Sequence, residues 1–153
     1  MRVLGIRCES SAITCAVLEG NLEAPVLVCI EQAKMPTTYD FAKGANFLRM
    51  RLTAILAANM VIKVGVRTPE SVRQLTESFR ERLRVEGVML AACAETGVTV
   101  TQGPLATMSR LLGVKSAKVL LESDDYRGID LAKLTPIKRE AILMGASLLE
   151  SES

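Results

Sequence analysis

The sequence of 153 residues contains no histidine and no tryptophan, and it has only two tyrosines and three phenylalanines. Without histidine the chain cannot form a Ser-His-Asp or Cys-His nucleophile system, a histidine general base or a histidine-ligated metal site. The scarcity of aromatic side chains argues against a single-strand binder that stacks bases on an aromatic platform. The net charge of +2 is too small to indicate a polyanionic partner by itself.

The four cysteines lack the C-x-x-C spacing of a redox or zinc motif; they are Cys8, Cys15, Cys29 and Cys93. We interpret them as free, buried thiols in a reducing compartment rather than as disulfides. No secretory signal is expected before the first strand, because Arg2 and Arg7 interrupt a very short apolar run. The longest apolar stretches are too short to span a bilayer, so we expect a cytoplasmic protein with no membrane partner.

Hydrophobic residues make up 49% of the chain, which is enough for the core of one domain. We expect that domain to span residues 1–153, with a polar tail from about residue 150. Three apolar runs, at residues 3–6, 11–19 and 25–33, are rich in Val, Ile, Thr and Cys. Short turns between them predict an antiparallel meander of strands.

Helical and strand periods alternate in the rest of the chain. Asp40 can cap a helix that ends near Asn59, and Thr68-Pro69-Glu70 marks the start of a second helix reaching about residue 95. Further strands are predicted at residues 61–66 and 98–101, and further helices at 104–112 and, capped by Thr135, at 138–149. This order predicts an α/β fold whose five-stranded mixed sheet is flanked by helices, the layout of a ribonuclease H-like fold.

One face of the second predicted helix consists of small residues. Gly87, Ala91 and Ala94 recur at i, i+4 and i+7, a spacing that places them on one side of a helix. Such a face lets a helix approach a sheet or another helix closely. We therefore predict that it packs in the core rather than binding a ligand.

Three segments resemble the RuvC-type Holliday junction resolvases. The opening VLGIRCESSAITCAVLEG is similar to their first hairpin, where a strand ending in Gly-Ile precedes a catalytic Asp. The stretch KVGVRTPESVRQLTESFRERLRVEGVMLAACAETGVTV resembles their strand ending in a catalytic Glu and the helix after it. The tail PIKREAILMGASLL resembles their last helix, where two Asp lie three residues apart. The chain also resembles small bacterial proteins with this layout and a degenerate active site.

The resemblance implies two divalent metals, Mg²⁺ or Mn²⁺, held by carboxylates and acting on a phosphodiester. Here the matching positions carry Arg7, Arg67, Ile137 and Glu140, so only one acid remains and two positions have changed sign. We therefore expect no catalytic residue, no metal and no cofactor. A slip of the alignment by one or two residues leaves Glu9, with Glu140, as an alternative metal site.

The arginines at the matching positions have two interpretations. If the fold is correct, Arg7 and Arg67 lie at neighbouring strand ends and form a clamp for a phosphate or carboxylate. Alternatively, they are two surface arginines paired with Glu9 and Glu140. A second candidate for nucleic-acid or anion binding is the basic cluster of Lys43, Arg49 and Arg51.

Two further charged runs are weaker candidates. The first alternates between the basic residues Arg73, Arg80, Arg82 and Arg84 and the acidic residues Glu70, Glu77, Glu81 and Glu86. It is typical of a solvated helix face with i, i+4 pairs, with a nucleic-acid footprint as the alternative. The second run contains Asp124, Asp125 and Asp130, which we interpret as a hydrated turn rather than a Ca²⁺ or Mg²⁺ site.

Three functions remain open at this point. The first is a catalytically degenerate RuvC-like domain that binds structured nucleic acid or a protein; the resemblance suggests a homodimer. The second is an active metal-dependent nuclease with relocated carboxylates: Glu9, Glu140 and one of Asp124 or Asp125. The third is a nucleotide binder of the sugar-kinase or actin type, or a relative of the tRNA threonylcarbamoylation proteins. It is disfavoured because such proteins usually need a second domain of this kind.

Overall fold

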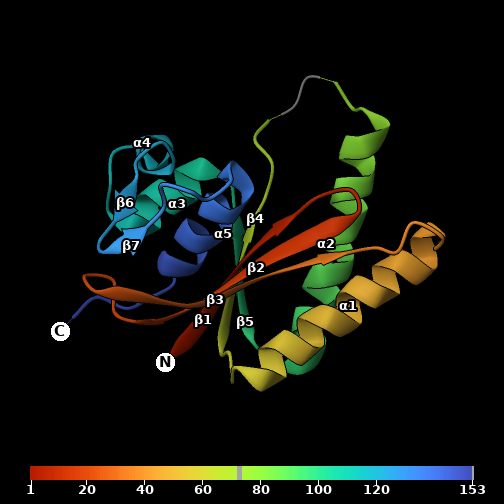
Figure 1. Ribbon diagram of the computed structural model, residues 1–153, viewed down its shortest axis with the longest axis horizontal. Coiled ribbons are helices and arrows are strands. Elements are labelled where there is room, and N and C mark those ends of the chain that lie inside the picture. Colours follow the sequence, from red (N-terminus) through yellow and green to blue (C-terminus); the bar gives the residue numbers. More distant parts are fainter. Residues whose placement is uncertain (72–73, 153) are drawn as a thin grey trace.

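A five-stranded mixed sheet forms the centre of the fold (Figure 1). The computed structural model describes residues 1–71 and 74–152. The sheet contains β1 (Arg2–Cys8), β2 (Ala12–Gly20), β3 (Pro25–Lys34), β4 (Lys63–Arg67) and β5 (Thr99–Gly103) in the order β3-β2-β1-β4-β5. The first three strands are antiparallel, and β4 and β5 run parallel to β1. The predicted α/β, ribonuclease H-like sheet is confirmed.

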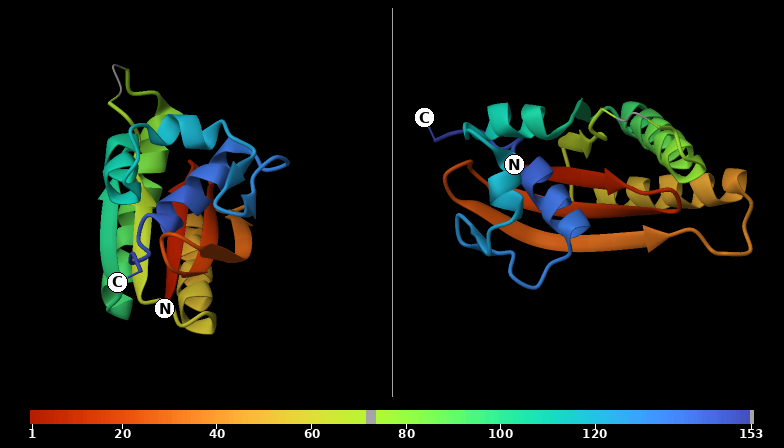
Figure 2. Two further views of the ribbon diagram at one scale, coloured as in Figure 1. Left: turned by 90° about the vertical axis from the view of Figure 1, so that its left-hand side faces the viewer. Right: turned by 90° about the horizontal axis from the view of Figure 1, so that it is seen from above.

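Helices cover both faces of the sheet. They are α1 (Phe41–Ala58), α2 (Glu77–Thr96), α3 (Leu105–Leu112), α4 (Ala117–Leu121) and α5 (Pro136–Ala146). A small hairpin of β6 (Asp125–Tyr126) and β7 (Ile129–Asp130) precedes α5. The left view of Figure 2 shows α5 in front of the sheet, with α1 behind it. None of the described helices combines the length and apolar character that a membrane crossing requires.

Each face of the sheet has its own hydrophobic core. Leu4 and Ile6 of β1 belong to the cluster that includes α1 and α2. Val3 of the same strand belongs to the cluster that includes α3, α4 and α5. This alternation follows from the two-residue period of a strand. Three of the four free cysteines are buried as predicted, whereas Cys29 is only partly buried.

Helix α5 lies unusually close to β1. A Cβ atom added at Gly5 would lie only 1.9 Å from the carbonyl oxygen of Ala141 and 2.4 Å from the backbone nitrogen of Gly145. The two backbones can approach this closely only because Gly5 has no side chain. The contact places the first turns of α5 over the carboxyl-terminal end of β1, where the site described below lies.

Most predicted helix ends are confirmed by capping contacts. Asp40 accepts a hydrogen bond of 2.8 Å from the backbone nitrogen of Lys43, and Thr135 caps α5 in the same way. Gly97 and Gly113 end α2 and α3 in the left-handed conformation.

The predicted start of the second helix at residues 68–70 is wrong. Helix α2 begins at Glu77, because Thr76 caps it by accepting a hydrogen bond from the backbone nitrogen of Phe79 at 3.1 Å. The Glu70 carboxylate instead accepts a bond from the backbone nitrogen of Leu105, at the start of α3. Arg73, part of the predicted basic run, lies outside the described residues.

The prediction for the small-residue face of α2 is also wrong. Gly87, Ala91 and Ala94 are exposed, because α2 turns its larger apolar residues, such as Val85 and Met89, toward the sheet. Two elements were not predicted at all, the short helix α4 and the β6–β7 hairpin. In that hairpin Arg127 and Gly128 both have positive φ, at 47° and 90°, as a two-residue turn requires.

Candidate functional site

Arg7 and Arg67 are brought together at the end of the central parallel strand pair. They are direct partners in the β1–β4 register, and both side chains reach Glu140 on α5. The Nε atom of Arg7 donates a hydrogen bond of 3.0 Å to Oε2 of Glu140. The Nε atom of Arg67 lies 3.0 Å from Oε1 of the same carboxylate. Each oxygen of Glu140 therefore faces its own guanidinium.

This ion-paired triad is largely shielded from solvent. The side chains of Arg7, Arg67 and Glu140 are 15%, 7% and 12% exposed. The Arg67 side chain is thus buried, which corrects the interpretation of both arginines as surface residues. Glu140 is the partner of both, and among the described residues Glu9 forms no ion pair with either. Arg67 also lies 3.3 Å from the exposed Glu70.

The contact between Arg67 and Glu140 is electrostatic rather than a well-formed hydrogen bond. Although the two atoms are 3.0 Å apart, the Arg67 Nε group has no hydrogen-bond partner of good geometry among the described residues. Its Nη1 group donates to the backbone carbonyl of Thr68, and that of Arg7 donates to the carbonyl of Cys8. These backbone contacts hold both guanidiniums near the strand ends.

Arg82 and Glu86 extend the charged cluster from α2. Arg82 Nε lies 3.3 Å from Glu86, and its Nη2 donates to the carbonyl oxygen of Arg67 at 3.4 Å. Glu86 is only 5% exposed. This pair therefore does not belong to a solvated helix face, although the predicted i, i+4 pairing is correct. The clue in the sequence was spacing, because Glu86 precedes Met89 by three residues and Cys93 by seven, which puts all three on one side of a helix.

The packing around this cluster shifts the protonation of several groups. Burial lowers the pKa of Arg82 below its usual range, and the nearby Arg7 lowers it further. Burial raises the pKa of Glu86 above the usual carboxyl value, although Arg82 opposes that shift. Burial, followed by the charge of Glu86, raises the pKa of the Cys8 thiol well above its ordinary value. Cys8 is therefore a neutral, inert thiol.

A pocket of about 290 Å³ opens beside the triad. Its wall contains two arginines, three hydroxyl side chains and one acid; the lining residues are Arg7, Glu9, Ser10, Thr76, Ser78, Phe79, Arg82 and Ile137. The start of α2 contributes Thr76, Ser78 and Phe79. The positive end of a helix dipole and two guanidiniums therefore share one cavity, a combination that favours an anion. We call this cavity the Arg7 pocket.

The residues at this site do not fit a divalent metal centre. Ile137 has no ligand atom, and both oxygens of Glu140 face arginines. Across residues 1–71 and 74–152, no group of three His, Cys, Asp or Glu side chains could hold a metal ion. Asp124 lies 4.0 Å from Arg139, while Asp125 and Asp130 pair across the β6–β7 hairpin.

Arg49 and Arg51 lie on α1, and no ion pair or hydrogen bond among the described residues joins them to the triad. Arg49 is 3.9 Å from Glu95 of α2, and Arg51 is 3.7 Å from Glu31 of β3. The cluster of Lys43, Arg49 and Arg51 is therefore separate from the largely buried pair of Arg7 and Arg67.

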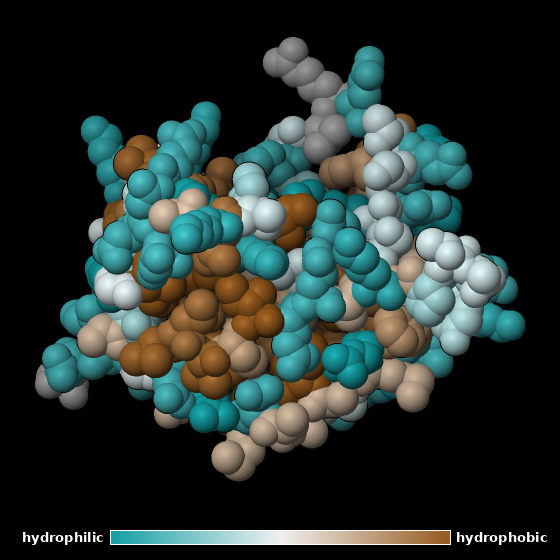
Figure 3. Space-filling model, in the orientation of Figure 1, coloured by the Kyte–Doolittle hydropathy of each residue, from teal (hydrophilic) through white to brown (hydrophobic). Residues whose placement is uncertain are grey.

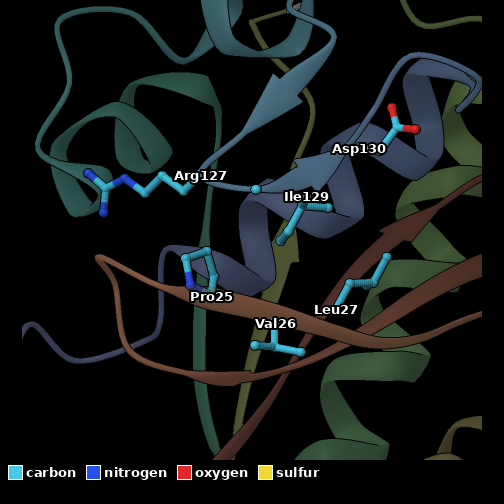
Figure 4. Close-up of a pocket in the computed structure, with 7 residues that line it drawn as sticks. Pro25, Val26, Leu27, Arg127, Ile129 and Asp130 are labelled. Carbon is cyan, nitrogen blue, oxygen red and sulfur yellow. The ribbon is translucent and has the colours of Figure 1, made fainter.

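Another hollow, of about 480 Å³, lies between the start of β3 and the β6–β7 hairpin. Figure 4 shows Ile129 pointing toward β3, while the side chain of Arg127 extends away from it. Val26 of β3 is 52% exposed. In Figure 3, apolar side chains gather on the surface over β3 and α5. This face has the character of a contact surface rather than of a catalytic site.

Solved structures of Holliday junction resolvases share the fold of this chain. Thermus thermophilus RuvC in complex with a Holliday junction substrate matches with a TM-score of 0.76 and 18% identity, covering 96% of this chain and 91% of that chain. Another Thermus thermophilus RuvC structure gives a TM-score of 0.76 and 18% identity, with coverage of 96% and 92%. The yeast mitochondrial Holliday junction resolvase Ydc2 matches with a TM-score of 0.56 and 11% identity, covering 95% of this chain and 77% of that chain. No protein-family model and no curated protein matches significantly. The chain thus has the RuvC-like, ribonuclease H-like fold of the Holliday junction resolvases.

Proposed function

We propose that this chain is a catalytically degenerate RuvC-like domain that binds structured nucleic acid without cleaving it. The observation that carries this proposal is the Glu140 carboxylate, whose two oxygens each face an arginine at 3.0 Å. A metal ion there would meet two guanidiniums instead of additional carboxylates. At about 4 Å, two unit charges interact by roughly 4 kcal/mol at the effective dielectric of a protein surface, so this exchange of sign disfavours a cation strongly.

In this proposal the Arg7 pocket receives a backbone phosphate. Arg7 and Arg82 supply charged donors, and the hydroxyl of Ser10 supplies a neutral one. Glu9 also lines the pocket and would repel an anion, so the two arginines must outweigh it. The expected ligand is therefore a nucleic acid, held by phosphate contacts and bound more weakly as salt rises.

Binding of a labelled four-way DNA junction, measured by fluorescence anisotropy over a series of salt concentrations, tests this function. We expect Arg7→Gln and Arg82→Gln to weaken binding and to reduce the slope of log K against log salt by about 0.9 for each phosphate that is no longer neutralised. Arg110→Gln is the matched control, because Arg110 is an exposed arginine on α3, outside the pocket. Equal binding by all three variants and the wild type would contradict the role of the pocket.

The competing function is an active nuclease with relocated carboxylates. It requires Mg²⁺- or Mn²⁺-dependent cleavage of junctions that depends on Glu9 and Glu140. We expect no cleavage by the wild type under either metal. Cleavage by a clean preparation that disappears in both Glu9→Gln and Glu140→Gln would establish the nuclease and overturn our proposal, because Glu9 takes no part in the ion-paired triad.

We further propose that the chain acts as a homodimer in the cytoplasm. The exposed small residues Gly87, Ala91 and Ala94 leave α2 with a face that another helix could approach closely, and Leu83 on the same helix is 42% exposed. Light scattering should give the mass of a dimer, and Ala91→Arg should give that of a monomer. A monomer at every concentration would contradict the dimer.

The proposed location in the cytoplasm is supported by the four free thiols, which fit a reducing compartment.

A protein partner is the second candidate, and the apolar surface over β3 favours it (Figure 3). β3 is an edge strand of the sheet, so its outer backbone groups can pair with an added strand. A Val26→Lys variant, tested beside the junction-binding variants, separates the two functions. Loss of a co-purifying protein with intact junction binding would indicate that this face serves a protein partner.

A further inference from the structure

A shallow groove on α1 lies outside the site proposed above. Its lining residues are Tyr39, Lys43, Asn46, Phe47 and Met50, and its volume is about 440 Å³. Tyr39 is 46% exposed and Met50 is 58% exposed, so large apolar surfaces face solvent. Volumes of about 300–1,000 Å³ are usual for small-ligand sites. We call this feature the Tyr39 groove.

The groove combines an aromatic face with an aromatic edge. The rings of Tyr39 and Phe47 have centroids 6.4 Å apart and planes at 84°, an edge-to-face pair. Phe41 packs against the core instead of lining the groove, and the guanidinium carbon of Arg84 lies 6.0 Å from its ring centroid. Three of the five aromatic residues therefore gather at the start of α1. A low aromatic content limits the number of bases that a protein can stack, but it does not prevent the few aromatic rings from lying together at one site.

The polar groups of the groove are arranged for an anionic, hydrogen-bonding ligand. Arg49 donates to Oδ1 of Asn46 from Nε at 3.1 Å and from Nη2 at 3.0 Å, which fixes the orientation of that amide. Lys43 forms no ion pair with any described residue. The acid nearest in sequence, Asp40, caps α1 through the backbone nitrogen of Lys43. Glu95 is the only described acid paired with Arg49, at 3.9 Å.

We propose that the Tyr39 groove binds an unpaired nucleobase of a nucleic acid, which stacks on the ring of Tyr39. The inference deepens the proposed function and rests on it. A base has the flat π-face that Tyr39 can stack, acceptor atoms on its edge for the second amide hydrogen of Asn46, and a phosphate that Lys43 can attract. A second copy of the chain fits less well, because a two-fold contact would bring the cations around the groove face to face.

Tyrosine fluorescence can report on this groove directly. The chain has no tryptophan and two tyrosines, and the second, Tyr126, is only 3% exposed. The Tyr126 hydroxyl has no hydrogen-bond partner among the described residues, so Tyr126→Phe should fold normally. In that variant Tyr39 is the sole tyrosine. We expect an oligothymidylate to quench its fluorescence, and an abasic deoxyribose-phosphate chain of the same length to leave it unchanged.

Binding measurements with the same two probes separate stacking from charge. Stacking of a base on one aromatic side chain contributes about 1–3 kcal/mol, which strengthens binding about five-fold to more than a hundred-fold. We therefore expect Tyr39→Leu to bind the oligothymidylate about ten-fold more weakly and the abasic chain as well as the wild type does. Tyr39→Phe, which keeps the ring, should bind both normally. Val119→Ala is the control for loss of an exposed apolar side chain elsewhere, since Val119 on α4 is 65% exposed.

The outcomes distinguish this inference from the proposed function. If the wild type binds the oligothymidylate without quenching, and Tyr39→Leu binds equally well, the groove proposal is overturned while nucleic-acid binding stands. If the wild type binds no nucleic acid, including the junction, both proposals fall. If the Tyr39 fluorescence of Tyr126→Phe changes with protein concentration alone, and Tyr39→Leu abolishes self-association measured by light scattering, the groove belongs to a second copy and the inference is overturned.

Discussion

Arg7 and Arg67 are direct neighbours in the parallel register of β1 and β4, and both lie 3.0 Å from the carboxylate of Glu140. Two like charges at adjacent positions repel each other unless a counter-charge stands between them. Glu140 supplies that charge from α5, so the triad joins two strands to a helix. Glu140 thus explains why the fold tolerates one buried and one largely buried arginine side by side, and why the site fits a metal ion poorly.

Removal of the shared counter-charge should destabilise the fold. Glu140→Gln leaves two largely buried guanidiniums without a carboxylate, and breaking a buried pair in this way costs about 3–5 kcal/mol. Urea unfolding followed by circular dichroism measures the change. Glu19→Gln is the control, because Glu19 pairs with Arg2 at a half-exposed site where about 1 kcal/mol or less is expected. Equal losses for the two variants would show that burial of the triad contributes nothing.

Restoring acids at the matching positions should create a cation site. The combination Arg7→Asp, Arg67→Glu and Ile137→Asp surrounds Glu140 with carboxylates, the ligands that Mg²⁺ and Mn²⁺ prefer. We expect the variant to melt at a lower temperature without metal and to release or absorb heat on titration with Mn²⁺. The neutral set Arg7→Asn, Arg67→Gln and Ile137→Asn is the control. The same heat from the wild type would favour the nuclease with relocated carboxylates.

Glu86 should make the stability of the protein fall as pH rises. Burial raises its pKa, so the folded state holds this proton at pH values where the unfolded state has released it. The stabilisation is complete below the ordinary carboxyl pKa and is lost as pH rises through the raised value. Because the lowered pKa values of Glu23 and Glu150 act in the opposite direction, the difference in urea midpoint between the wild type and Glu86→Gln measures this decline over a pH series. Glu95→Gln, at a 70% exposed site, should keep the wild-type slope.

A single methyl group added between α5 and β1 should destabilise the fold, because the two backbones are in close contact at Gly5. Gly5→Ala places a carbon atom 1.9 Å from the Ala141 carbonyl oxygen, so the helix must move outward. Overpacking of this kind costs about 1–3 kcal/mol. In contrast, Gly87→Ala meets no atom within 4 Å on the exposed face of α2, and the higher helix propensity of alanine should stabilise it by about 0.5–1 kcal/mol. Thermal melts of the two variants should shift in opposite directions.

The element order was predictable because its signals are local. The apolar runs of β1, β2 and β3, rich in Val, Ile, Thr and Cys, and the caps at Asp40 and Thr135 each depend on residues close together in the chain. The start of α2 was mispredicted because Pro69 is a local signal for a helix that a distant contact, from Glu70 to the backbone of Leu105, replaces.

The sequence predicted where the site lies and three of its residues, but not the contribution of Arg82 and Glu86 from α2. The resemblance to RuvC-type resolvases placed Arg7, Arg67 and Glu140 near one another, and the structure joins them. Arg82 and Glu86 were assigned to a solvated face, since charge alternation along a helix does not show which side meets the sheet. The exposed stripe at Gly87 was misread for the same reason.

By itself the sequence determined the order of the five sheet strands and of α1, α2, α3 and α5, the caps at Asp40 and Thr135, and the exclusion of histidine chemistry, because each depends on residue type and local spacing. Only the tertiary structure decided that one carboxylate serves two arginines and that two rings meet beside Lys43. Such contacts depend on how far a helix is rotated and how closely it approaches a strand. That geometry is set by packing over the whole core, and at α5 by the space left at Gly5.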